Sequence, residues 1–144
     1  MINQSARHQK GMAIMDVVII LSVVAVLTAI MFPKFTTMLH RSREGRTMAN
    51  LSDIRGAIAI YYSDHSGLFP SDEGTPETRL SSDLVPKYLP EMPPVDLSHY
   101  HPEKLNTVQD RFNHKGDWVY TTLNGHVFVN TNHVDTHGKP ISEW

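Results

Sequence analysis

Histidines are the first residues of this sequence whose type and spacing suggest chemistry. The chain has 144 residues, and nine of them are histidine. His99 and His101 lie two residues apart and His133 and His137 four apart, which are spacings that metal ions use. A glycine and a proline follow the second pair, so that pair cannot share one face of a helix. We therefore expect exposed, solvated histidines and no cofactor bound through them.

Oxygen donors gather near the end of the chain, in the segment NTNHVDTHGKP. The candidate ligands for a calcium ion are Asn130, Asn132 and Asp135, because Ca²⁺ prefers the oxygen atoms of amides and carboxylates. Only one of the three is a carboxylate. The alternative is a turn in which Asn, Asp and Gly serve the backbone geometry. Calcium is therefore a candidate ligand of this segment, and a metal-free turn is the default.

Signatures of an enzyme or of a nucleic-acid-binding protein are missing from the sequence. It contains no G-x-S-x-G, P-loop or H-E-x-x-H motif, and no cysteine. The lack of cysteine excludes disulfides, thiolate zinc sites and thiol nucleophiles. The formal net charge is -2, whereas a strong nucleic-acid binder is visibly basic. We predict a protein that is not an enzyme and does not bind nucleic acid.

One carboxylate stands out because it lies in an apolar stretch. Residues 12–32 form a run of 21 residues with a single charge, Asp16. As a helix this run would span about 31 Å, close to the hydrocarbon core of a bilayer, roughly 30 Å. A carboxylate inside a membrane costs about 2.5–3.5 kcal/mol and needs a partner. If the chain were cut after Gly11, the new α-amino group of Met12 would be a cation one helical turn from Asp16.

The residues around Asp16 resemble the class III signal of type IV pilins and type II secretion pseudopilins. A short basic leader ends at Gly11 and is followed by Met12, an acidic residue, an apolar run and Pro33. The resemblance implies cleavage between Gly11 and Met12 and N-methylation of Met12. It also implies that Asp16, which stands where the family has glutamate, pairs with the amine of a neighbouring subunit during assembly.

The resemblance also implies the fold class and the division of the chain. The expected fold is α+β and type IV pilin-like, with a leader peptide at residues 1–11 and a transmembrane or assembly helix at 12–32. An amphipathic half of the same helix follows at 33–66, after a kink at Pro33. Residues 67–144 then form a small globular head that contains an antiparallel β-hairpin or sheet.

The function implied by the resemblance is that of a structural subunit. It would polymerise through its N-terminal helix into the helical homo-oligomer of a type IV pilus or a type II secretion-like pseudopilus. The partners implied are a prepilin peptidase, an assembly ATPase, an inner-membrane platform protein and membrane lipid. The subunit would first lie in the bacterial inner membrane with its head outside the cytoplasm, and then in the periplasmic or extracellular filament.

The residues leave alternatives open. A cleaved secretory signal would have a shorter apolar core than this run and a small-residue cleavage site, which is missing. A single-span anchor of a binding module or an enzyme fits the length but leaves Asp16 unexplained. A third alternative is a minor tip pilin that acts in initiation or DNA uptake, and the basic segment 40–46 (HRSREGR) is the evidence for it. We interpret that segment as solvated and close to anionic lipid headgroups.

The second half of the predicted helix carries an apolar stripe that should pack on the head. Its members recur three and four residues apart and are Leu51, Ile54, Ile58 and Tyr61. The helix should end near His65, because Gly67 suits the C′ position. Residues 68–112 contain seven of the nine prolines. They read as an irregular connection with one short helix around residues 82–88.

Two short strands are predicted near the end of the chain. Residues 117–122 and 126–130 are rich in β-branched and aromatic residues, and Asn124-Gly125 between them favours a type I′ hairpin turn. A lone hairpin is marginal in water and must pack its apolar face on the helix. The expected core residues of the hairpin are Trp118, Tyr120 and Phe128.

Overall fold

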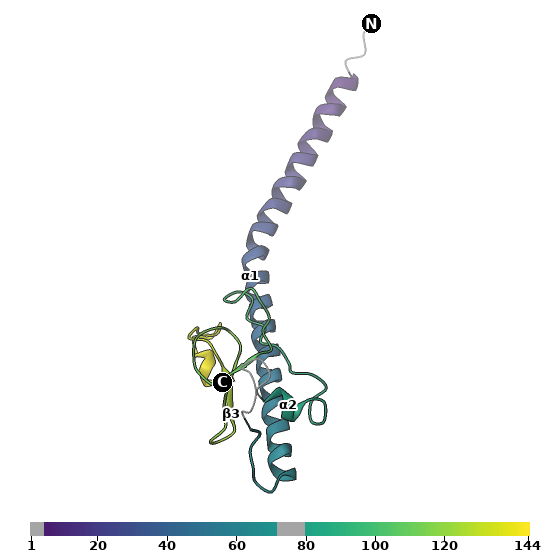
Figure 1. The fold of residues 1–144 in the computed structure, drawn as a ribbon. Coiled ribbons are helices and arrows are strands. Elements are labelled where there is room, and N and C mark those ends of the chain that lie inside the picture. The colour runs from purple at the N-terminus through teal and green to yellow at the C-terminus, as the bar shows by residue number, and fades with distance from the viewer. Residues whose placement is uncertain (1–4, 72–79) are drawn as a thin grey trace. The chain divides into compact units, whose positions relative to one another are not determined.

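A computed structural model describes residues 5–71 and 80–144 of the chain, with side chains from residue 14 onward. The long helix α1 (Ser5–Asp64) is followed by α2 (Ser81–Leu84), β1 (Val108–Gln109), β2 (Trp118–Thr121), β3 (His126–Val129) and the 3-10 helix η1 (Ile141–Glu143). Figure 1 shows this order along the ribbon. The result confirms the predicted α+β class.

The chain divides into two compact units, which are described separately. One comprises residues 1–38 and the other residues 39–144. The second half of α1 therefore belongs to the same unit as the head. The division predicted from the sequence, with the amphipathic half of the helix at 33–66 and the head at 67–144, stays a prediction. The apolar residues of this half of the helix pack with those of the head in one core.

The end of α1 lies where the sequence predicts it, but the left-handed conformation begins one residue earlier, at Ser66. The helix ends at Asp64. Ser66 has φ 56° and Gly67 has φ 85°. The Gly67 N–H donates to the Tyr62 carbonyl at 2.9 Å, the bond from C″ to C3 that closes a helix end. Ser66 is thus the C′ residue, and Gly67 comes one position later than predicted.

The head contains a three-stranded sheet in the order β1-β2-β3. Strands β2 and β3 form the predicted antiparallel hairpin, with Trp118 opposite Val129 and Thr121 opposite His126. Strand β1 pairs with β2 in parallel, with Val108 beside Trp118. The two-residue strand β1 lies in the proline-rich connection and was not anticipated, because two residues carry no periodicity.

The hairpin loop corrects the predicted turn. Because Thr121 pairs with His126, four residues remain in the loop instead of two. Within the loop only Gly125 has a positive φ, of 67°, whereas a type I′ turn requires positive φ at both central residues. Asn124 instead accepts a hydrogen bond from the His126 N–H through its side-chain oxygen, at 3.1 Å. The turn prediction was wrong because the final pair of the ladder leaves a longer loop than a two-residue turn allows.

The two faces of the hairpin differ in burial, which corrects one predicted core residue. Trp118 and Tyr120 are almost fully buried, and they share a face with Val129 and Val127, which stand opposite them. Phe128 pairs with Val119 on the other face and is not part of the main core cluster. Successive side chains of a strand point to opposite faces, so Phe128 could not share the face of Trp118.

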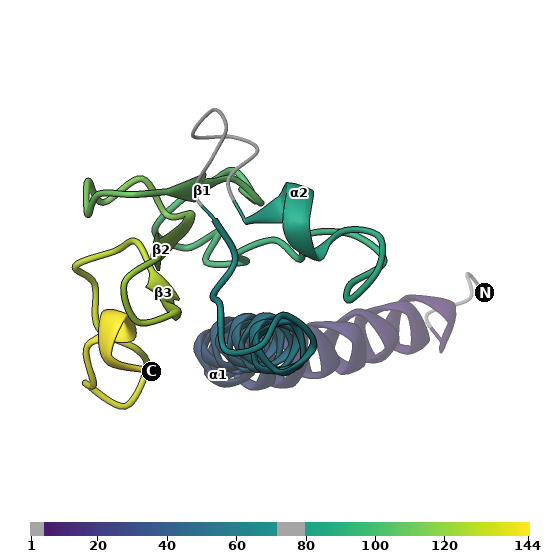
Figure 2. The same ribbon diagram turned by 60° about the horizontal axis from the view of Figure 1, so that its bottom comes forward.

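The predicted stripe of α1 forms the other side of the core. Leu51 is 2% exposed, Ile54 0% and Ile58 3%, and all three belong to one cluster with the hairpin residues. Tyr61 is half-buried against that cluster. Figure 2 shows the second half of α1 nearly end-on, with the strands and α2 gathered on one side of it.

The proline-rich connection is as irregular as the sequence predicts, and its helix is shorter. Helix α2 spans four residues, against an expected seven. Val85 leaves it in an extended conformation, φ -102° and ψ 135°. The residue before a proline is disfavoured in the α region, so Pro86 ends the helix at this point.

Candidate functional site

The N-terminal part of α1 is an apolar rod. Between residues 14 and 32 the large apolar side chains are each 52–69% exposed in the isolated chain. The helix is long and apolar enough to cross a membrane. A soluble protein rarely exposes so much contiguous apolar surface, and a helix that is apolar all round is covered by lipid or by similar helices.

The polar residues within this rod differ in how they find hydrogen-bond partners. The hydroxyls of Ser22 and Thr28 donate to the carbonyls of Ile19 and Val24, at 2.7 and 2.8 Å. A hydrogen bond from a side-chain hydroxyl to a carbonyl of the same helix gives the hydroxyl a partner inside lipid, and no other segment is needed. Asp16 is exposed on the same helix and is a different case. An ionised carboxylate only accepts, and a helix interior offers it no free N–H, so Asp16 needs a donor from elsewhere.

The other predicted processing and assembly residues are also placed on α1. Gly11 and Met12 are helical, and the Met12 side chain is outside the described part of the structure. Pro33 lies inside the helix, and the helical assignment runs through it. The hydroxyls of Thr36 and Thr37 both donate to the Pro33 carbonyl, at 2.9 and 3.1 Å. The kink at Pro33 stays a prediction.

A buried carboxylate that the sequence analysis missed fixes the head to α1. Asp96 is 1% exposed and accepts from Arg46 of the helix at 3.3 Å and from Lys104 at 2.9 Å. Its backbone N–H and carbonyl both bond the Thr47 hydroxyl, at 3.0 and 3.2 Å. Asn50 adds a bond from its side-chain amide to the Pro94 carbonyl, at 2.7 Å. Arg46 belongs to the segment predicted to be solvated, and in the structure it pairs with a carboxylate of the head.

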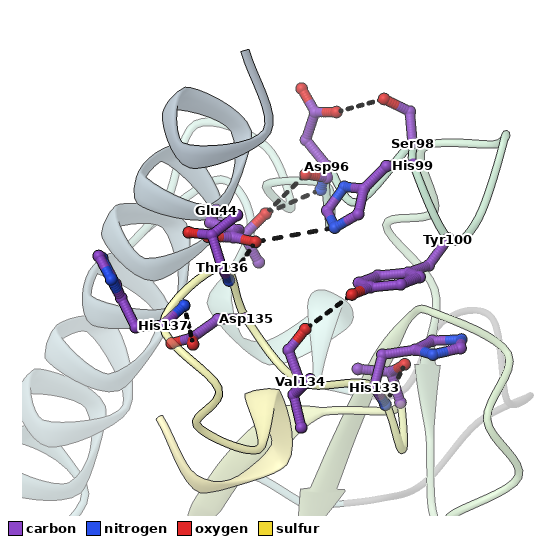
Figure 3. A network of polar contacts seen from close by, with 12 residues as sticks. Glu44, Asp96, Ser98, His99, Tyr100, His133, Val134, Asp135, Thr136 and His137 are labelled. Atoms are coloured by element: carbon purple, nitrogen blue, oxygen red, sulfur yellow. Dashed lines mark hydrogen bonds and ion pairs between the residues drawn. The ribbon is translucent and has the colours of Figure 1, made fainter. Parts of the chain in front are cut away.

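Glu44 is a second missed residue and extends the stripe of α1 toward its N-terminus. It is 5% exposed, and its two carboxylate oxygens accept from the Thr136 N–H at 3.0 Å and from the Thr136 hydroxyl at 2.7 Å. Figure 3 shows this contact between the helix and the C-terminal loop. Glu44 lies three residues before Thr47 and seven before Leu51, so the helical spacing held the signal. Glu44 was not included in the predicted stripe because a charged residue normally indicates an exposed position.

Two of the three calcium candidates, Asn130 and Asp135, lie in separate hydrogen-bond networks. Asn130 is fully buried, and its side-chain oxygen accepts from the N–H groups of Asn113 and His114, at 2.9 Å each. Its amide donates to Asp117 at 2.6 Å. Asn132 is exposed. The Asn130 side chain thus has a structural role, and calcium binding stays a prediction.

Asp135 organises the last turn of the chain. One carboxylate oxygen accepts from the N–H groups of His137 and Lys139, at 2.8 and 2.9 Å, and the other from the Trp144 indole, at 3.2 Å. Burial by itself raises the pKa of Asp135, but these hydrogen bonds outweigh burial and hold the pKa below its usual value.

Five of the described histidines are less exposed than predicted, whereas His114, His126 and His137 are exposed as predicted. The side chain of His99 is 9% exposed, and its ring stacks on that of His40 with centroids 4.5 Å apart. Tyr100 stacks on His133 at 4.0 Å, and the His101 ring stands edge-on to His133 at 5.6 Å. Sequence spacing did not reveal this cluster, because its members come from three segments. Within residues 14–71 and 80–144, no group of three or more candidate metal ligands lies together.

Curated pilin and fimbrial proteins resemble the chain in sequence. The type IV major pilin protein PilE of Neisseria gonorrhoeae is 25% identical over 84 residues, which are 58% of this chain and 50% of that protein. The fimbrial protein EcpC of Eikenella corrodens is 30% identical over 64 residues, 44% of this chain and 41% of that protein. The chain thus spans half or less of the length of each relative. No family model matches it, and no solved structure matches it significantly.

The fold and these likenesses agree with one another. A single long helix with an apolar N-terminal part precedes a small three-stranded head, and the relatives are named as pilin and fimbrial proteins. In sequence the chain resembles type IV pilin and fimbrial proteins, and its long apolar helix with a small three-stranded head is consistent with a type IV pilin-like α+β fold.

Proposed function

We propose that the chain is a structural subunit that polymerises through its N-terminal helix into a type IV pilus or a type II secretion-like pseudopilus. The observation that carries the proposal is the apolar rod of residues 14–32, whose large side chains are more than half exposed in the isolated chain. Lipid covers such a helix before assembly, and a bundle of identical helices covers it afterwards. The pilin and fimbrial relatives support this role. The role is structural and requires neither catalysis nor a cofactor.

Assembly under this proposal begins with removal of the leader between Gly11 and Met12. A prepilin peptidase cuts there, the new amine of Met12 is methylated, and an assembly ATPase and a platform protein of the inner membrane then extract the subunit. The cut creates a cation one helical turn from Asp16, which otherwise has only the acceptor capacity of a carboxylate.

Asp16 pairs with the Met12 amine of a neighbouring subunit in the filament. In a low-dielectric bundle an unmatched charge costs about 3–5 kcal/mol, so the pair selects one register of the helices. Asp16 therefore determines how the helices pack in the filament. Mutation of Asp16 should reduce filament assembly more than insertion of the subunit into the membrane.

The tip-located alternative rests on the basic segment 40–46, part of which contacts the head. Arg46 pairs with Asp96, and Glu44 is buried against the C-terminal loop. Arg41 is exposed and the Arg46 side chain is 60% exposed, so the segment keeps basic groups at the surface. We favour a filament subunit over a tip pilin because the curated relatives are a major pilin and a fimbrial protein.

The first experiment measures the mass of the protein extracted from the membrane of its bacterial host. We expect a mature chain that starts at Met12 and is heavier by one methyl group. A Gly11→Val variant is the matched control, and it should keep residues 1–11. Recovery of the wild-type protein with its first eleven residues attached would refute processing, and with it the source of the partner cation.

The second experiment tests the pairing of Asp16 in sheared filaments. Asp16→Ala should be processed normally and be absent from the filament fraction, because the Met12 amine then lacks its carboxylate. Asp16→Glu restores the residue typical of the family and should assemble, while Ser22→Ala removes only a hydroxyl that bonds its own helix. A normal filament yield from Asp16→Ala would contradict the pairing.

A further inference from the structure

The most unusual polar group in the head is a buried imidazole without a hydrogen-bond partner. The side chain of His99 is 9% exposed, and neither its Nδ1 nor its Nε2 makes a hydrogen bond with any described residue. The Glu44 Oε1 lies 3.7 Å from Nε2, close enough for an ion pair with a protonated ring but too far for a hydrogen bond. Figure 3 shows His99 between the helix and the C-terminal loop. A buried polar group without partners costs stability and calls for an explanation.

The groups around His99 come from three segments and are mostly basic or neutral. Helix α1 contributes His40, whose ring stacks on His99 at 4.5 Å, together with Arg43 and Glu44. The adjacent Tyr100 ring lies 4.0 Å away and stacks in turn on His133 of the C-terminal segment. Glu44 is the one acidic group among these, and both of its oxygens already accept from Thr136.

We propose that His99 is an acid-sensitive latch between α1 and the head. In its neutral form the ring fills the space between His40 and Tyr100. Protonation gives it a second N–H and a charge that the closed site can neither hydrate nor pair at hydrogen-bond distance. The segment around 96–101 then leaves α1 so that water can solvate the imidazolium, and the Glu44–Thr136 contact beside it opens too.

The direction of the pH dependence follows from these surroundings. Burial lowers the pKa of His99, the neighbouring His40 lowers it further, and the attraction of Glu44 does not reverse the shift. The open segment has the ordinary histidine pKa of about 6.5 and binds the proton more readily. Opening is therefore favoured as the pH falls below that value. Its equilibrium constant can rise by up to about thirtyfold between pH 7.5 and pH 5.0.

This inference concerns the docking of the head on its own helix and goes beyond the proposed filament function. It requires neither leader removal nor the pairing of Asp16. Failure of the latch would leave the filament proposal intact, and failure of filament assembly would leave the latch testable on the purified subunit.

The test is hydrogen exchange of the full chain in detergent micelles at pH 7.5 and pH 5.0, corrected for the intrinsic effect of pH. The reporters are the amides of Tyr100 and His101, which bond the Leu97 carbonyl, and that of Thr136, which bonds Glu44. We expect these amides to lose protection at pH 5.0, by up to about thirtyfold. The amides of the β2–β3 ladder should keep theirs. Equal protection at both pH values would overturn the proposal.

The matched variant is His99→Phe, which keeps a stacking ring and cannot bind a proton. Its reporter amides should respond to pH much less than those of the wild type, whereas His126→Phe, a change at a histidine outside the cluster, should behave like the wild type. An undiminished response in His99→Phe would overturn the proposal. If that variant does not fold, a titration of ¹³C-labelled His99 in the wild type decides. A pKa at or above 6.5 would contradict the latch.

Discussion

At the scale of single residues, the head is held on α1 by buried polar side chains as well as by apolar packing. The Thr47 hydroxyl both donates to the carbonyl of Asp96 and accepts from its N–H, so one side chain satisfies two buried backbone groups. Arg55 adds two bonds of 2.8 Å, to the carbonyls of Val127 and Trp144. A buried backbone group must find a partner, so these contacts fix the register of the head along the helix.

Thr47→Val tests this arrangement because it keeps the shape of the side chain and removes the hydroxyl. We expect the free energy of unfolding to fall by about 1–3 kcal/mol, since the N–H and carbonyl of Asp96 lose their partner. Guanidinium unfolding of the full chain in detergent, followed by tryptophan fluorescence, measures the loss. Thr37→Val is the control, because its hydroxyl bonds only the exposed α1 backbone and should change stability little. Equal losses in both variants would contradict the assignment.

At the scale of elements, the glycines show where the backbone needs the missing side chain. Gly125 in the hairpin loop has φ 67°, and a Cβ there would lie 2.4 Å from the Phe69 ring. Gly138 has φ 84° and open space around it. Gly45 is an exposed residue of α1 with nothing within 4 Å. Substitution of these glycines therefore tests three effects: helix propensity at Gly45, backbone strain at Gly138, and backbone strain together with a steric contact at Gly125.

Alanine at each of these three positions should change stability in a fixed order. Gly45→Ala should stabilise the helix by about 0.8–1 kcal/mol, because alanine is the better helix former. Gly138→Ala should cost about 1–2 kcal/mol for its left-handed conformation. Gly125→Ala should cost more, since Phe69 must also move. Unfolding midpoints of the three variants measure the order, and a Gly125→Ala loss no larger than that of Gly138→Ala would refute the contact with Phe69.

At the scale of the whole molecule, the head should lose stability in acid in two steps. Burial lowers the pKa values of His99 and His101, so the unfolded chain binds protons first as the pH falls below about 6.5. The stability present above that value is then lost as the pH falls through the lowered pKa values. Asp135 also has a lowered pKa, and it adds a second loss below about pH 4, where the unfolded carboxylate is protonated first.

Unfolding midpoints in guanidinium at pH 7.5, 5.5 and 3.5 test both steps. The midpoint should decrease at each, and Asp135→Asn should reduce the second decrease while leaving the first unchanged. Glu103→Gln, a change at an exposed carboxylate, is the control and should leave both in place. A midpoint that rises as the pH falls would contradict the lowered pKa values of the two histidines and of Asp135.

The sequence by itself determined the long helix, its apolar N-terminal part, the stripe on its second half, the end near His65 and the hairpin. All of these depend on local patterns, namely periodicity, Gly and Pro positions and β-branched runs, which neighbouring residues decide. Trp118 and Tyr120 were predicted in the core for the same reason. Phe128 was misplaced because the pairing register, which sets the face of each side chain, cannot be obtained from composition.

Only the tertiary structure decided the parallel strand β1 and the buried roles of Glu44, Asp96 and His99. The three side chains depend on partners far away in the sequence, such as Thr136 for Glu44 and Thr47 for Asp96. A charged residue in a sequence normally indicates solvent, because burying a charge is costly unless a partner is supplied. Partners such as Thr136 come from loops without a periodic pattern, so the fold had to bring them together before their roles could be recognised.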